Sequence, residues 1–139
     1  RPSLAHSSGS MRTRGQVEAD ISEAFVRFEK EYMGRGPEET RTYVFDDMVL
    51  VRLRGVLTPA EKNLVKIDPS AHGRSLIKQV RIELLEKARP LLEKIIQDVT
   101  GQAVRSLHTD ISTATGERVV LFTLDGRPDM GEPGTRDQV

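Results

Sequence analysis

Hydrophobic and polar positions along the chain follow the period of a helix in some stretches and that of a strand in others. Within residues 16–32, apolar side chains recur every three or four positions, which predicts one stripe of an amphipathic helix: Val17, Ile21, Ala24, Phe25, Phe28 and Tyr32. The intervening charged residues, Glu18 among them, are expected to point away from this stripe. Gly34 and Pro37 then end the helix, because proline cannot continue it.

Two strands and a short helix are predicted next. Segments 41–45 and 48–54 are rich in β-branched and aromatic residues and flank Asp46-Asp47, a pattern typical of a hairpin. Thr58 stands before a proline and three positions before Glu61, which predicts a capping box. A helix should therefore cover residues 59–66 and end at the Asp68-Pro69-Ser70 break.

The dominant feature is a long helix over residues 73–99. Its predicted apolar stripe consists of Ile77, Val80, Leu84, Ala88, Leu91, Ile95 and Val99. Four more residues widen this stripe, namely Leu76, Leu85, Leu92 and Ile96. Pro90 predicts a kink, since it removes one backbone hydrogen bond and clashes with the carbonyl of Glu86. Gly101 is expected to cap the C-terminal end.

Segments 103–113 and 117–124 are predicted to be strands, so that the element order is α-β-β-α-α-β-β. This order indicates an α+β fold, with a four-stranded antiparallel sheet and helices packed on one face. We expect residues 16–125 to form a single domain. Residues 1–15 are predicted to be a flexible leader or vector-derived segment, and residues 126–139 a flexible tail.

The predicted lengths leave apolar surface uncovered. A helix of about 27 residues is ~40 Å long, whereas strands of six to nine residues span only ~20–30 Å, so the long helix should overhang the sheet. The strands are also apolar on both faces at their centres, and helices cover only one face. Because large uncovered apolar patches are uncommon on monomers, we expect a homodimer.

Composition and charge exclude several classes of protein. The 139 residues contain 21 Lys and Arg against 21 Asp and Glu, a balance that argues against a nucleic-acid partner. The absence of cysteine excludes disulfides and thiolate metal sites and is compatible with a cytoplasmic location. No apolar run approaches the ~18 residues of a membrane-spanning helix, so we expect no direct membrane insertion.

Two groups of residues could carry chemistry. Strand alternation places Ser106, His108, Asp110 and Ser112 on one face, where His108 and Asp110 could form a metal half-site or an acid–base pair. The alternative is that these two residues hydrogen-bond each other and neighbours such as Arg52 or Arg54. Arg52 and Arg54 could themselves bind an anion, or simply pair with carboxylates including Asp110 and Glu117. We assign no catalytic residue, metal or cofactor.

Several stretches resemble one bacterial family. They include Gly34-Arg35-Gly36-Pro37, Leu57-Thr58-Pro59-Ala60-Glu61 and Leu107-His108-Thr109-Asp110, within a resemblance that covers residues 11–125. The family is that of the Na+-translocating membrane-potential-generating system subunit MpsC. The resemblance implies a small soluble protein that, in some bacteria, belongs with a proton-channel-like membrane subunit and a large soluble subunit. That system is associated with membrane potential and inorganic carbon uptake.

Three hypotheses follow. The first is a non-enzymatic accessory subunit of a membrane cation or bicarbonate transport system, located in the cytoplasm or held at the inner membrane by a partner. The second is a small-molecule or anion-sensing module, and the third is a metal-dependent enzyme built on His108 and Asp110. A pocket with convergent polar groups would favour the second or third, and a flat apolar face the first.

Overall fold

The computed structural model describes residues 12–67 and 72–131. The elements in chain order are α1 (Arg14–Met33), β1 (Glu39–Phe45), β2 (Met48–Arg54), α2 (Pro59–Ile67), α3 (His72–Thr100), β3 (Val104–Ser112) and β4 (Glu117–Leu124). This order confirms the predicted α+β fold. Most of the predicted leader, most of the predicted tail and the break at residues 68–70 lie outside the described residues.

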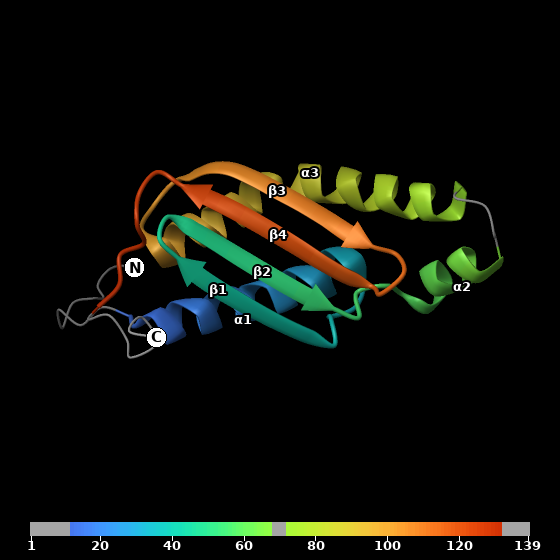
Figure 1. Ribbon diagram of the computed structural model, residues 1–139, viewed down its shortest axis with the longest axis horizontal. Helices are drawn as coiled ribbons and strands as arrows, with labels where there is room; N and C mark the ends of the chain where they lie inside the picture. The colour runs from blue at the N-terminus through green and yellow to red at the C-terminus, as the bar shows by residue number, and fades with distance from the viewer. Residues whose placement is uncertain (1–11, 68–71, 132–139) are drawn as a thin grey trace.

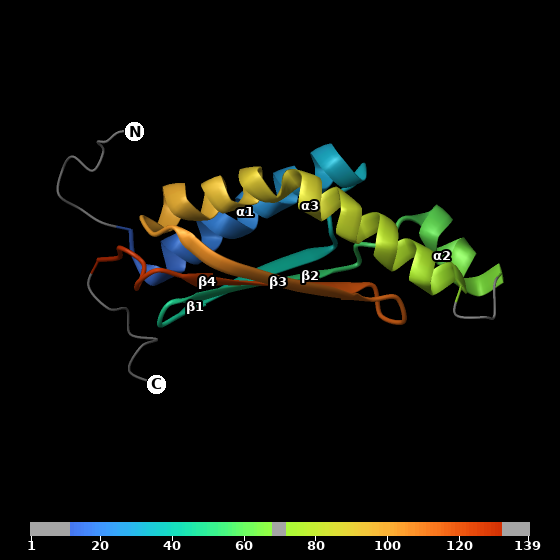
Figure 2. The ribbon, with the colours of Figure 1, turned by 90° about the horizontal axis from the view of Figure 1, so that it is seen from above.

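The four strands form one antiparallel sheet in the order β1-β2-β4-β3 (Figure 1). Each hairpin is formed by strands adjacent in sequence, and β2 pairs with β4 to join the two hairpins. The first hairpin turns through Asp46 and Asp47, and Asp46 adopts a positive φ of 55°. Figure 2 shows α1 and α3 side by side on one face of the sheet, and no helix of the described residues covers the other face.

The core lies between these two helices and the inner face of the sheet. The apolar stripe predicted for α1 is buried except at Tyr32, and Phe25 meets Phe122 of β4 edge-to-face with ring centroids 6.1 Å apart. The prediction that Glu18 points to solvent is wrong. Its carboxylate is buried and accepts a hydrogen bond of 2.7 Å from the amide of Val44 on the edge strand β1, which pairs with a strand on one side only.

The centre of the apolar stripe on α3 differs from the prediction. The buried positions are Gly73, Ile77, Arg81, Leu85, Ala88, Leu92, Ile96 and Thr100. By contrast, Val80, Leu84 and Leu91, which the prediction placed on the central line, are exposed. The helix is rotated so that the charged Arg81 lies inside, and periodicity of apolar residues alone does not anticipate this.

α3 extends beyond the sheet, as Figure 1 shows. Its N-terminal part and α2 project together past the ends of the strands, and α2 itself contributes no fully buried residue. α3 is continuous through Pro90 and bends near its middle in Figure 2. Gly101 follows the helix with a positive φ of 76°, which confirms the predicted cap.

The chain after β4 stays against the domain as far as Gly131. The amide of Asp129 donates to the carbonyl of Thr100 at 2.7 Å, and the amide of Gly131 donates to the carbonyl of Arg12 at 2.8 Å. Pro128, directly before Asp129, is buried. The described start and end of the chain therefore lie beside each other.

The capping box at the start of α2 is confirmed. The Thr58 amide donates to Glu61 Oε1 at 2.8 Å, and the Glu61 amide donates to Thr58 Oγ1 at 3.2 Å. We predict that Thr58→Ala lowers the free energy of unfolding by ~1 kcal/mol, because the first turn of α2 loses its side-chain acceptor. Chemical denaturation measures the change. Ser75→Ala, at an exposed position on α3, is the control, and equal stability of the two variants would contradict the role of Thr58.

Candidate functional site

The six residues predicted to form a polar face all lie on the helix-free face of the sheet. The register pairs Arg52 of β2 with Val119 of β4, and Val119 with Asp110 of β3, so these three side chains share one face. Alternation along the strands adds Arg54, Ser106, His108 and Ser112 to the same face. Because β4 lies between β2 and β3, the two arginines stand two strands away from His108 and Asp110.

His108 and Asp110 do not pair with each other, so the expectation of a hydrogen bond between them is wrong. The His108 ring lies 3.1 Å from Ser106 Oγ, at the other neighbouring position on the same face. The Asp110 carboxylate accepts from the amide of Ile111 at 2.8 Å and from Lys78 of α3 at 3.3 Å. The hydrogen bond from the Ile111 amide lowers the pKa of Asp110; burial opposes this shift, and Lys78 adds to it.

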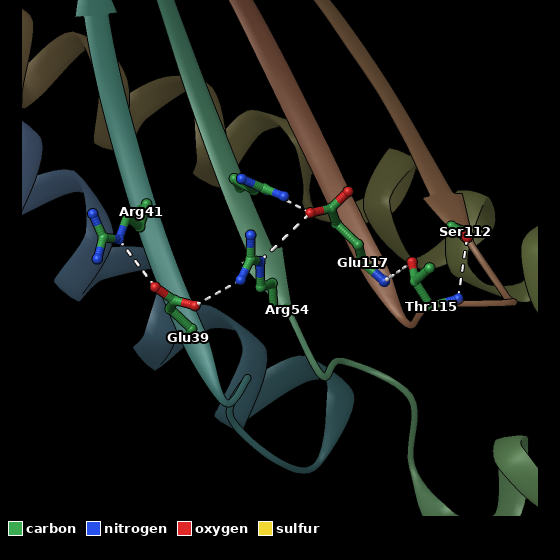
Figure 3. A network of polar contacts seen from close by, with 7 residues as sticks. Glu39, Arg41, Arg54, Ser112, Thr115 and Glu117 are labelled. Carbon is green, nitrogen blue, oxygen red and sulfur yellow. Dashed lines mark hydrogen bonds and ion pairs between the residues drawn. The ribbon is translucent and has the colours of Figure 1, made fainter.

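A belt of ion pairs crosses one end of this face (Figure 3). It consists of Glu39 and Arg41 of β1, Arg52 and Arg54 of β2, and Glu117 of β4, and we call it the arginine belt. Arg41 donates to Glu39 at 3.0 Å, Arg54 lies 3.4 Å from Glu39 and 3.7 Å from Glu117, and Arg52 hydrogen-bonds Glu117. Pairing of the arginines with Glu117 is one of the arrangements predicted, whereas pairing with Asp110 is not found. Three guanidinium groups thus share two carboxylates.

A pocket of about 650 Å³ adjoins the arginine belt. Arg52, Arg54 and Glu117 form one wall, and the turn between β3 and β4, at residues 113–116, forms another. The third wall comes from α2 and the segment before it, through Leu57, Lys62, Val65 and Lys66. His108 and Ser106 are not among its lining residues, so the predicted polar face divides between this pocket and the far part of β3.

The described residues contain no group of three or more His, Cys, Asp or Glu side chains that could hold a metal ion. Nor, in the same part of the chain, is any helix both long and apolar enough to cross a membrane.

A second group of charges lies inside the domain and was not predicted. Arg81 of α3 is 2% exposed and forms two hydrogen bonds with Glu61 of α2, at 2.8 and 3.0 Å, and one of 2.7 Å with the carbonyl of Val56. Glu29 of α1, 1% exposed, lies 3.7 Å from Arg81 and 3.9 Å from Arg118 of β4. We call Glu29, Glu61, Arg81 and Arg118 the buried charge cluster.

Burial governs the protonation equilibria of this cluster. It raises the pKa of Glu29, although Arg118 and Arg81 oppose the shift, and it lowers the pKa of Arg118 despite the nearby Glu29. Burial also acts to raise the pKa of Glu61, but hydrogen bonds from Arg81 and Thr58 together with the charge of Arg81 outweigh it and lower the pKa. Glu29 Oε1, Arg81 Nη1 and Arg118 Nη1 are buried and have no hydrogen-bond partner among the described residues.

The spacing of Glu29 and Arg81 along their helices is the sequence feature that could have predicted the buried charge cluster. Glu29 follows Phe25 by four positions on α1, and Arg81 lies four positions from both Ile77 and Leu85 on α3. Each charge therefore interrupts a buried apolar row of its own helix. A basic and an acidic residue that interrupt two such rows are candidates for a buried ion pair, because an isolated buried charge is very costly.

Two hairpins in one sheet and two helices on a single face define a small α+β protein, and ion pairs lie buried between its helices and its sheet. The chain belongs to the family described as Na+-translocating membrane potential-generating system (MpsC), which it matches over residues 13–126. This confirms the resemblance found in the sequence. It is also 42% identical over 113 residues to a Bacillus subtilis (strain 168) protein named uncharacterized protein YbcI, covering 81% of this chain and 89% of that protein. No solved structure gives a significant match.

Substitution of Arg81 tests how much the buried charge cluster contributes to stability. We predict that Arg81→Met lowers the free energy of unfolding by about 3–5 kcal/mol, because Glu29 and Glu61 lose the cation that they share. Denaturant unfolding measures this loss. Arg105→Met, which removes only an exposed pair with Asp125, should change stability by less than ~1 kcal/mol.

The same variant should respond to pH. Without Arg81 the pKa of the buried Glu29 rises further, and a carboxyl group whose pKa is raised in the folded state stabilises folding as the pH falls through that pKa. The stability gap between wild type and Arg81→Met should therefore narrow between pH 7 and pH 5. A gap independent of pH, or a loss no larger than in Arg105→Met, would contradict this account.

Proposed function

We propose that this protein is a non-enzymatic accessory subunit of a bacterial membrane cation or bicarbonate transport system that generates membrane potential. It acts by association with other proteins, at the cytoplasmic side of the inner membrane. Membership of the MpsC family supports the link to such a system. An uncovered apolar surface on the longest helix supports association, and that observation carries the proposal.

This surface is a row of exposed side chains on α3 beside its buried stripe. We call Leu76, Val80, Leu84 and Leu91 the α3 strip, and they are between 37% and 49% exposed. Leu76, Val80 and Leu84 are spaced four residues apart and lie in the part of the helix that leads to the overhang. A row of exposed large aliphatic side chains on a helix is typical of a protein–protein interface.

The spacing of the α3 strip suits a second copy of the same chain. When two α3 helices lie antiparallel about a two-fold axis between Leu85 and Glu86, Val80 of one copy faces Leu91 of the other. In this arrangement Leu76 faces the half-buried Ile95. Lys87 lies within the row, between Leu84 and Leu91, and in this arrangement it stands opposite Leu84 of the other copy. Its ammonium group there approaches the carboxylate of the neighbouring Glu83. This self-complementarity supports a homodimer.

We predict that the purified protein has twice the mass of one chain by light scattering behind size exclusion. Val80→Glu combined with Leu84→Glu should yield a folded monomer, since burying four carboxylates at a two-fold interface is unfavourable. Ile82→Glu is the matched control, because Ile82 is 51% exposed on the same helix but outside the α3 strip. A wild-type monomer, or a dimer that survives the double substitution, would overturn the homodimer.

The transport role needs a test in the native host. We predict that the tagged chain, recovered from solubilised membranes, retains a polytopic ion-translocating protein in a constant ratio. Deleting the chain should also lower the membrane potential reported by a potential-sensitive dye. Recovery without a membrane protein of that class, together with an unchanged potential after deletion, would refute the accessory role whatever the oligomeric state.

A further inference from the structure

The pocket beside the arginine belt has an excess of positive charge. Four of its lining residues are cationic, namely Arg52, Arg54, Lys62 and Lys66, whereas only Glu38 and Glu117 carry negative charge. The cations come from two separate elements, β2 and α2, which approach the pocket from different sides. The chain as a whole has no net charge, so this excess is a local property of the pocket.

The two lysines have no evident structural role. Neither Lys62 nor Lys66 has an ion pair or side-chain hydrogen bond with another described residue. They stand four positions apart on α2, where two like charges destabilise a helix by a few tenths of a kcal/mol. On a nine-residue helix, repulsion between the two lysines therefore destabilises the fold slightly. An anion bound between the lysines would replace this repulsion with attraction.

The two arginines retain unused donors toward the pocket. Arg52 and Arg54 both contact Glu117 Oε2, and their side chains are 40% and 50% exposed. A guanidinium group has five N–H donors in a planar fork that matches the oxygens of a phosphate group. Arg52 contacts this one oxygen of Glu117, and Arg54 contacts it and Glu39 Oε1, so both guanidinium groups keep N–H donors for a second anion.

We propose that this pocket binds a small organic phosphate with several negative charges. Arg52 and Arg54 bind phosphate oxygens from the sheet, and Lys62 and Lys66 neutralise the remaining charge from α2. Leu57 and Val65, which also line the pocket, contact the less polar part of the ligand. A volume of about 650 Å³ lies within the usual range of small-molecule sites, roughly 300–1,000 Å³.

Isothermal titration with ATP and with inorganic pyrophosphate, at low ionic strength and without divalent cations, tests the site. We expect both probes to bind and to raise the melting temperature, and adenosine to do neither. Lys62→Gln combined with Lys66→Gln should weaken binding by about tenfold or more through lost charge–charge attraction. Lys30→Gln combined with Lys94→Gln removes the same charge from α1 and α3, outside the pocket lining, and should leave affinity within about twofold of wild type.

Vesicles distinguish a soluble phosphate from a lipid headgroup. Flotation with phosphatidylglycerol vesicles, compared with phosphatidylcholine vesicles, reports binding to an anionic membrane surface. Binding of ATP or pyrophosphate that depends on Lys62 and Lys66, without flotation, supports the proposal. Flotation that depends on those lysines with no binding of the soluble probes would overturn it in favour of lipid. Equal affinity of the pocket and control variants, or no binding of any probe, would also overturn it.

Discussion

The pairing of Arg81 inside the domain is the constraint on which the rest of the structure depends. Apolar residues cover so much of α3 that hydrophobic burial alone would tolerate more than one rotation of this helix against the sheet. A guanidinium group, in contrast, is tolerated inside only where carboxylates and carbonyls receive it. Glu61, Glu29 and the Val56 carbonyl provide those partners at one place, and this selects the rotation in which Ile77 and Leu85 are buried.

The rotation of α3 that Arg81 selects determines the positions of both the α3 strip and the pocket. Turning Arg81 inward leaves Val80 and Leu84 on the outside, where they become available to another chain. Glu61 binds Arg81 while it also closes the capping box with Thr58, so the first turn of α2 is fixed to α3. Because Lys62 follows Glu61 directly, the same contact determines where the lysines of α2 stand relative to the sheet.

Much of the fold could be predicted from local patterns, and the main errors have one cause. The hairpins, the capping box and the cap at Gly101 depend on interactions between residues close together in the sequence, so a single sequence is enough to predict them. The rotation of α3 and the burial of Glu18 and Glu29 depend on partners 20 or more positions away in the sequence. The strand order also depends on contacts between distant parts of the sequence. It places β4 next to β2, so that Arg52 contacts Glu117 rather than Asp110. The pocket could not be predicted from local patterns, because its walls come from β2, α2 and the β3–β4 turn, which meet only in the folded chain.

The hydrogen bond between Gly131 and Arg12 places the two ends of the described fold together, on the side of the domain opposite α2 (Figure 1). A domain with adjacent ends is topologically suited to circular permutation, because a short peptide can join them and the chain can be reopened at a tight turn. Reopening at Asp46, between β1 and β2, would break no strand and would leave the α3 strip and the pocket untouched. The architecture is thus that of a module that could be inserted into a loop of another protein without rearranging its sheet.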